Sequence, residues 1–254
     1  MCLILIAWQA HPDHALLVAA NRDEFHSRPS DPAGFWADRP SILAGRDLEA
    51  MGTWLGVTRQ GKFAAITNYR DPRDAVQPAQ SRGKLASRYL EGDASAAAYV
   101  SALQTERDAY RGFNLLAADR SELWWSSNRG NGARRLAAGI YGLSNHLLDT
   151  DWPKVERGKQ GLREALRGNP ALESLFELLA RTDVADDADL PDTGVGLERE
   201  RALSPLRIVS SSYGTRCSTV LIVGHDGRVR FAERAFSSEG RARDTLRYEF
   251  SLSD

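Results

Sequence analysis

The chain has 254 residues, of which 42% are hydrophobic, 26% charged and 8% aromatic. This length and composition fit a globular protein with a sizeable core and exclude a largely disordered chain. Lys and Arg number 33 against 34 Asp and Glu, so the formal net charge is -1 and there is no basic excess that would favour nucleic acid as a partner.

The first part of the chain predicts antiparallel strands. Residues 2–8 and 15–20 are apolar, β-prone runs, and the short polar segment between them predicts a hairpin turn. Residues 53–58 and 62–67 predict a second hairpin that turns at Gly61. We therefore expect this N-terminal part to be largely antiparallel sheet.

The middle of the chain predicts helices with one further hairpin among them. Spaced apolar residues predict helices over 81–90 and 95–110, and a hairpin follows over 113–127. Two more helices are expected over 153–167 and 170–181, the second with an asparagine as its N-cap and a proline at its first position.

After the helices, residues 183–194 form an acidic, turn-rich stretch that predicts a surface loop. The chain then returns to strands over 217–224, 228–234 and 245–252. Strands at both ends with helices between them predict an α+β fold of two antiparallel sheets layered with helices. No linker, repeat or low-complexity segment divides the chain, so we expect residues 1–254 to form a single domain.

The two cysteines, Cys2 and Cys217, lie in apolar strand-like runs, as free thiols do in a reducing compartment. The N-terminal run has no basic residue before it and no small-residue cleavage site after it, which argues against a signal peptide. No stretch approaches the roughly 18 apolar residues of a membrane span. We therefore expect a complete, cytoplasmic protein without a membrane span.

Cys2 directly follows Met1, and a methionine before such a small residue is normally removed after translation. Removal would leave Cys2 with a free α-amine, whose reference pKa of about 7.7–8.0 lies close to the thiol value of about 8.5. Amine and thiol would then act as base and nucleophile, as in an N-terminal nucleophile hydrolase that attacks an amide or ester carbonyl. The alternative is that Cys2 is a small hydrophobic residue of a buried strand.

A polar run ends the second predicted strand, which pairs with the strand that carries Cys2. Its members are Asn21, Arg22, Asp23 and Glu24. A carboxylate or a guanidinium at this place would hold the α-amine or tune the thiol by its charge. The alternative is a solvated strand end whose charges compensate one another.

Nine motifs together resemble the NRDE-motif proteins, also called the transport and Golgi organisation protein 2 family. They are the opening Met-Cys, ANRDEF, GTWLGVT, AAITNYRDP, SRGKL, GFNLLAAD, GIYGLSNHLLDTDWPKV, LPDTGVGLERERALS and YGTRCSTVLIV. These segments extend from residue 1 to about residue 236, nearly the whole chain. The family is in turn similar in layout to the cysteine-type N-terminal nucleophile hydrolases, which include choloylglycine hydrolases and penicillin V acylase.

The resemblance implies a four-layer αββα sandwich and a set of catalytic residues. By motif context these are Cys2, Asp23, Asn68, Asn145 and Arg216. A side-chain N–H of Asn68 or Asn145 would help to form an oxyanion hole, although Asn68 also fits a simple turn. Asp23 would hold the α-amine, and Arg216 would help to keep Cys2 ionised.

One departure from the hydrolase pattern concerns Arg22. The hydrolases carry an arginine shortly before the aspartate on the same strand, whereas Arg22 is adjacent to Asp23 and would point to the opposite face of a regular strand. The resemblance also implies that the NRDE segment helps to form a ligand site, so Asn21, Arg22 and Glu24 are candidate ligand-binding residues. Trp54 would add aromatic surface to such a pocket and His146, beside Asn145, would line it; the alternatives are core packing for the tryptophan and a structural role for the histidine.

Two functions are compatible with these patterns. The first is hydrolysis of a small amide or acyl thioester through Cys2, with no required cofactor. The second is a carrier without turnover, because members of the family have been linked to haem trafficking and to acyl-coenzyme A or lipid metabolism. Haem is then expected as a bound ligand, and no metal site is expected, since His11 and His14 lie at a predicted hairpin tip without a third ligand. The oligomeric state is left open.

Overall fold

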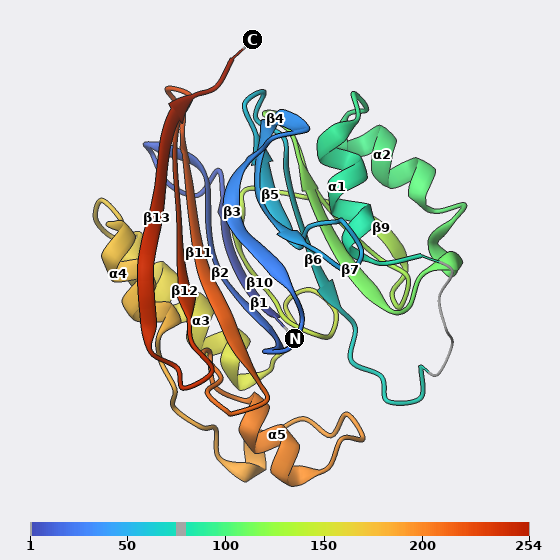
Figure 1. Cartoon of the computed structure of the whole chain (residues 1–254), viewed down its shortest axis with the longest axis vertical. Coiled ribbons are helices and arrows are strands. Elements are labelled where there is room, and N and C mark those ends of the chain that lie inside the picture. Colours follow the sequence, from blue (N-terminus) through green and yellow to red (C-terminus); the bar gives the residue numbers. More distant parts are fainter. Residues whose placement is uncertain (1, 75–79, 254) are drawn as a thin grey trace. The chain divides into compact units, whose positions relative to one another are not determined.

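The computed structural model describes residues 2–74 and 80–253 (Figure 1). The chain divides into two compact units, each built on one antiparallel sheet. The first unit comprises Met1–Ser27, Arg70–Pro72 and Ala138–Glu249, and the second comprises Arg28–Tyr69, Arg73–Ala137 and Phe250–Asp254. The single domain expected over residues 1–254 stays a prediction.

The sheet of the first unit has six strands in the order β10-β1-β2-β11-β12-β13. Their bounds are β1 (Cys2–Trp8), β2 (His14–Phe25), β10 (Gly139–Leu143), β11 (Tyr213–Gly224), β12 (Arg228–Phe236) and β13 (Ala242–Ser251). Every residue of β1 is buried, and the strand is paired on both edges, with β10 and with β2. This explains why residues 2–8 are apolar without alternation.

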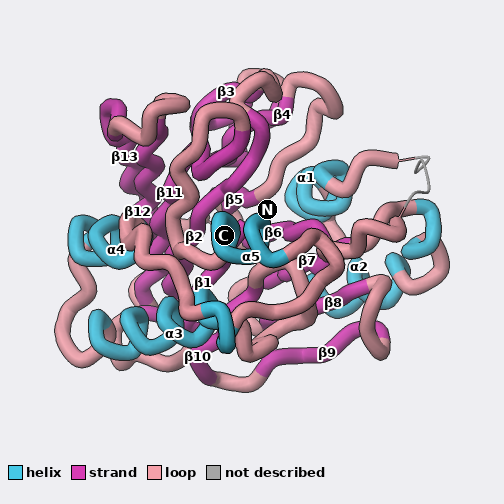
Figure 2. The backbone as a smooth tube through the Cα atoms, turned by 90° about the horizontal axis from the view of Figure 1, so that it is seen from below, coloured by secondary structure: helices cyan, strands magenta, loops and turns pink. Residues whose placement is uncertain are grey.

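Two helices cover one face of this sheet, namely α3 (Pro153–Ala165) and α4 (Leu172–Leu179), as Figure 2 shows. Leu3 and Leu5 of β1 pack on that face in the same core cluster as the helix residues Leu162 and Phe176. Side chains alternate along a strand, so Cys2 points to the opposite face of the sheet. A third helix of this unit, α5 (Leu197–Leu203), precedes β11.

The second unit contains a seven-stranded sheet in the order β3-β4-β5-β6-β7-β8-β9. The strands are β3 (Ser30–Trp36), β4 (Arg39–Asp47), β5 (Leu55–Thr58), β6 (Phe63–Asn68), β7 (Phe113–Ala118), β8 (Leu123–Ser127) and β9 (Gly132–Leu136). Helices α1 (Gly83–Glu91) and α2 (Ala96–Leu103) pack on it around a core that includes Leu85, Tyr89 and Val100. None of the helices in the described ranges is long and apolar enough to cross a membrane.

The predicted antiparallel hairpins are confirmed, and two helix predictions are wrong in their bounds. The helix expected over 95–110 ends at Leu103 and is followed by a separate 3-10 turn, Arg107–Ala109. The helix expected over 170–181 begins at Leu172 and ends at Leu179, and its N-cap is Ala171 in place of the expected asparagine. Strands β3, β4, β9 and β10 and helix α5 were not expected, since their sequences show no clear periodicity.

The second strand is longer than predicted and includes the whole polar run. β2 continues to Phe25 and is paired with β1 on one edge and β11 on the other. Asn21, Arg22 and Asp23 are accordingly buried, with 0%, 9% and 1% of their surface exposed. A solvated strand end, the alternative considered for this run, is therefore wrong.

Candidate active site

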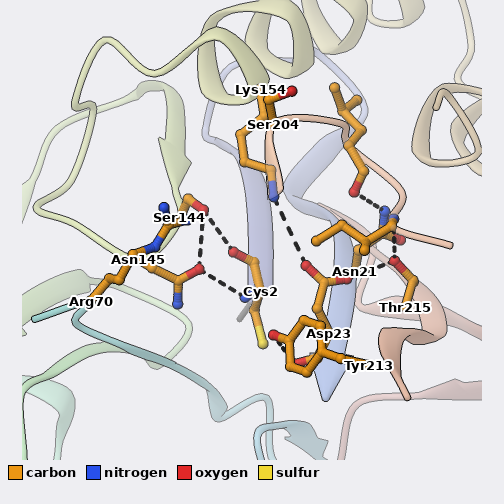
Figure 3. A network of polar contacts seen from close by, with 12 residues as sticks. Cys2, Asn21, Asp23, Arg70, Ser144, Asn145, Lys154, Ser204, Tyr213 and Thr215 are labelled. Carbon is orange, nitrogen blue, oxygen red and sulfur yellow. Dashed lines mark hydrogen bonds and ion pairs between the residues drawn. The ribbon is translucent and has the colours of Figure 1, made fainter. Parts of the chain in front are cut away.

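The backbone of Cys2 is held by two side chains from the segment that follows β10 (Figure 3). The ladder between β1 and β10 ends at the pair Ile4 and Leu143. Beyond it, the Cys2 backbone nitrogen donates to Asn145 Oδ1 at 3.2 Å, and Ser144 Oγ donates to the Cys2 carbonyl oxygen at 2.9 Å. These side chains extend the hydrogen bonding past the end of the ladder and fix the first described residue on this edge.

Across the sheet, the Cys2 side chain is flanked by Arg22. Cys2 pairs with Arg22 of β2, and Arg22 pairs with Cys217 of β11, so the three side chains form a row on one face. Burial raises the pKa of the Cys2 thiol, and the Arg22 charge and a hydrogen bond from the Asp23 backbone N–H oppose this increase. The thiol therefore keeps its proton at neutral pH unless a base removes it.

Strand β11 has a β-bulge between Thr215 and Cys217, opposite Asp23 and Arg22 of β2. Thr215 pairs with Asp23 and Cys217 pairs with Arg22, which leaves Arg216 as the extra residue. Thr215 Oγ1 donates to Asp23 Oδ1 at 2.6 Å, whereas the Arg216 guanidinium donates to the Phe25 carbonyl oxygen at 2.8 Å. The guanidinium directly across from Cys2 is thus that of Arg22, and the expected action of Arg216 on Cys2 stays a prediction.

Asp23 contacts a buried lysine that the sequence did not single out. Lys154 Nζ lies 3.9 Å from Asp23 Oδ2, and both side chains are almost completely inaccessible. Burial raises the pKa of Asp23, and Lys154 and the Thr215 hydroxyl oppose this shift. Burial likewise lowers the pKa of Lys154, and Asp23 opposes that shift. The signal in the sequence is a lysine directly after the proline that starts α3, but nothing local shows that it is buried.

Arg70 also belongs to the site and was missed. Its backbone N–H donates to the Asn145 carbonyl oxygen at 2.7 Å, and its guanidinium carbon lies 4.6 Å from the centre of the Trp152 ring. The guanidinium forms a buried ion pair with Glu200 of α5 at 2.5 Å. Arg70 therefore fixes the segment that carries both Asn145 and Lys154. Arg70 and Glu200 both lie within the motifs that carry the family resemblance, which was the available signal.

The remaining candidates have varied surroundings. Asn21 Nδ2 donates to the carbonyl oxygens of Leu179 and Leu206, so this side chain links β2 to the end of α4. Glu24 Oε1 accepts a hydrogen bond from the Phe25 N–H. The ligand-binding roles of Asn21, Arg22 and Glu24 stay predictions.

Two candidates lie in the second unit. Trp54 packs against the core of that unit, and Asn68 is the last residue of β6, where it pairs with Phe113. Their parts in a site with Cys2 stay predictions. Met1, whose removal the N-terminal nucleophile hypothesis requires, lies outside the described residues. Within residues 2–74 and 80–253, no group of three or more His, Cys, Asp or Glu side chains is arranged to hold a metal ion.

The His146 ring packs beside Trp152, with the ring centres 5.8 Å apart, and its Nδ1 lies 2.9 Å from Thr150 Oγ1. The Thr150 hydroxyl already donates to the Leu147 carbonyl oxygen at 2.7 Å, so His146 Nδ1 carries the proton and donates. Burial and the nearby Arg70 charge lower the pKa of His146. In the folded state the ring is thus neutral at pH values where it is charged in the unfolded chain.

We expect this histidine to make the protein less stable in mild acid. The folded pKa of His146 lies below the unfolded value of about 6.5. The contribution of His146 to stability is therefore fully present above pH 6.5 and is lost as the pH falls from there through the folded pKa. The unfolding free energy of the wild type should therefore fall more between pH 8 and pH 5 than that of His146→Asn. An NMR titration midpoint of His146 at or above the unfolded value would contradict this prediction.

The fold and the family follow from comparison with known proteins. A mutant conjugated bile acid hydrolase from Clostridium perfringens aligns over 100% of this chain and 98% of its own, with a TM-score of 0.50 at 9% identity. At that identity the likeness shows the fold alone, and the expected α+β, N-terminal nucleophile hydrolase-like fold of two antiparallel sheets with helices is confirmed.

The model of the Transport and Golgi organisation 2 family matches residues 1–238. The Transport and Golgi organization 2 homolog of Mus musculus is 37% identical over 275 residues, covering 99% of each chain. The corresponding human protein matches with the same identity and coverage. The chain belongs to the Transport and Golgi organisation 2 family.

Proposed function

We propose that this protein is a cysteine N-terminal nucleophile hydrolase that cleaves a small amide or acyl thioester through Cys2. The observation that carries the proposal is the hydrogen bond from the Cys2 backbone nitrogen to Asn145 Oδ1 at 3.2 Å. After loss of Met1 this nitrogen would be an α-amine, and the bond to Asn145 would orient it. The base and the nucleophile would then belong to one residue whose backbone is held in place.

The reaction would proceed in two steps. In the first, the Cys2 thiol gives its proton to the α-amine, and the sulfur bonds to the substrate carbonyl carbon. The carbon–nitrogen or carbon–sulfur bond of the substrate then breaks, and the leaving group takes the proton from the α-ammonium. In the second, a water molecule gives a proton to the α-amine, and its oxygen bonds to the acyl carbon of the thioester. The carbon–sulfur bond then breaks, the α-ammonium returns the proton to the Cys2 sulfur, and a carboxylic acid is released.

Three groups would assist this chemistry. The Arg22 guanidinium, directly across from Cys2, would stabilise the thiolate by its charge. Asn145 would hold the nitrogen through Oδ1, and its side-chain N–H would donate to the oxyanion. Asp23 would fix the position of this end of the site from the neighbouring strand.

We expect Cys2→Ala to abolish turnover of an aryl amide and of an acyl thioester with the same acyl chain, by about 1,000-fold or more. Cys217→Ala is the matched control, because Cys217 is equally buried in the same row of side chains. The measurement is the hydrolysis rate of protein whose intact mass shows that Met1 is absent. Turnover that survives in Cys2→Ala would refute the proposal.

The same experiment separates hydrolysis from the carrier function that the family resemblance suggests. A carrier would bind haem, acyl-coenzyme A or another lipid and would need neither the α-amine nor the thiol. Saturable binding of haem or acyl-coenzyme A, together with retained Met1 and no turnover that depends on Cys2, would favour the carrier.

A further inference from the structure

Lys154 violates two local rules at once. It is the second residue of α3, where the positive end of the helix dipole disfavours a cation, and only 1% of its surface is exposed. Its Nζ has no hydrogen-bond partner among the described residues. Such a costly placement in a buried position points to a functional role, since local rules are most often broken at functional sites.

The charge that faces Lys154 is that of Asp23, at 3.9 Å. The titratable and charged groups around this pair are the Cys2 thiol from β1, Glu24 from β2, Tyr213 from β11, and Arg70. Arg70 is already matched by its ion pair with Glu200. Lys154 is therefore a cation placed to balance Asp23 inside the site.

We propose that Lys154 is a positioning residue whose ammonium group balances the Asp23 carboxylate, so that the α-amine of processed Cys2 remains a base near neutral pH. This inference rests on the proposed hydrolase function. Without Lys154, the carboxylate would pair with the α-ammonium of Cys2 and hold the proton there. The same unbalanced anion would disfavour ionisation of the Cys2 thiol, which lies beside the Asp23 backbone.

The experiment measures alkylation of Cys2 by iodoacetamide as a function of pH, by mass spectrometry of the Cys2 peptide. We expect the midpoint to move upward by about one pH unit or more in Lys154→Met, because the Asp23 carboxylate, no longer balanced, opposes formation of the Cys2 thiolate. Lys154→Arg should stay close to the wild type. Lys159→Met is the matched control on the same helix, because Lys159 is paired with Asp149 at 3.0 Å and Glu156 at 3.3 Å.

The double variant Asp23→Asn/Lys154→Met removes both charges and should return the midpoint toward the wild-type value. It also keeps the test valid if Lys154→Met alone folds poorly, because neither charge of the pair is then left buried without its partner. An unchanged midpoint in folded Lys154→Met, or a midpoint that stays shifted in the double variant, would overturn the proposal.

The hydrolysis rate provides the second readout. When Met1 is removed from both proteins, the acidic limb of the pH–rate profile should lie at higher pH in Lys154→Met than in the wild type, in parallel with the alkylation midpoint. A shift in alkylation without turnover in any variant would support the charge balance and refute the hydrolase. Turnover whose pH profile does not change in Lys154→Met would refute the charge balance and leave the hydrolase intact.

Discussion

Replacing Glu200 with alanine should lower the free energy of unfolding by about 3–5 kcal/mol, because it leaves a buried guanidinium without its anion. The side chains of Arg70 and Glu200 are 8% and 4% exposed and lie 2.5 Å apart. Glu200 Oε1 also accepts hydrogen bonds from the backbone N–H and the hydroxyl of Thr193. The measurement is denaturant unfolding. The denaturant concentration at the midpoint should fall, while the dependence of the unfolding free energy on denaturant concentration should stay the same.

A control for this prediction is the next residue of the same helix. Arg201 pairs with Asp187 at the surface, where their side chains are 44% and 52% exposed, so Arg201→Ala should have little effect on stability. The double variant Arg70→Met/Glu200→Leu should regain much of the loss, since neither charge is then buried. A loss in Glu200→Ala no larger than that in Arg201→Ala would contradict the argument.

Thr215→Val should destabilise the protein by about 3 kcal/mol, although the two side chains have almost the same shape. The Thr215 hydroxyl donates to Asp23 Oδ1 at 2.6 Å and accepts from the Ile208 N–H at 2.9 Å. Valine would remove both bonds inside the protein, and each buried polar group left without its bond costs about 1–3 kcal/mol. Denaturant unfolding again measures the effect.

Two variants isolate the hydroxyl group. Thr215→Ser keeps it and should recover most of the stability. Thr219→Val alters the same strand, but the Thr219 hydroxyl makes only a long contact of 3.4 Å with Glu233, so a cost below about 1 kcal/mol is expected. Equal losses in Thr215→Val and Thr219→Val would show that the bulge does not have the role described.

Local patterns predicted much of the architecture. The hairpin of β1 and β2, the hairpin of β5 and β6, and the start of α3 at Pro153 follow from apolar runs, a turn glycine and a helix-initiating proline. The starts and ends of other elements were less well predicted. Helix α4 begins two residues later than expected, with Ala171 and not the predicted asparagine as its N-cap.

The site was predicted in part. Motif context identified Cys2, Asp23 and Asn145, and the structure brings these three together in the first unit. The burial of Asn21, Arg22 and Asp23 was not evident, because it depends on strands β1 and β11 on either side of β2. A polar run in the sequence has the same appearance whether its neighbours cover it or leave it in water.

By itself, the sequence determined the strand pattern, the family and the identity of the nucleophile candidate, because these depend on residues close together in the chain. The tertiary structure alone decided the partners of the charged groups. Asp23 meets Lys154, and Arg70 meets Glu200, across long stretches of chain. The bulge at Arg216 places Thr215 against Asp23 through strand register. Register and long-range pairing are set by packing of the whole sheet, which no local pattern contains.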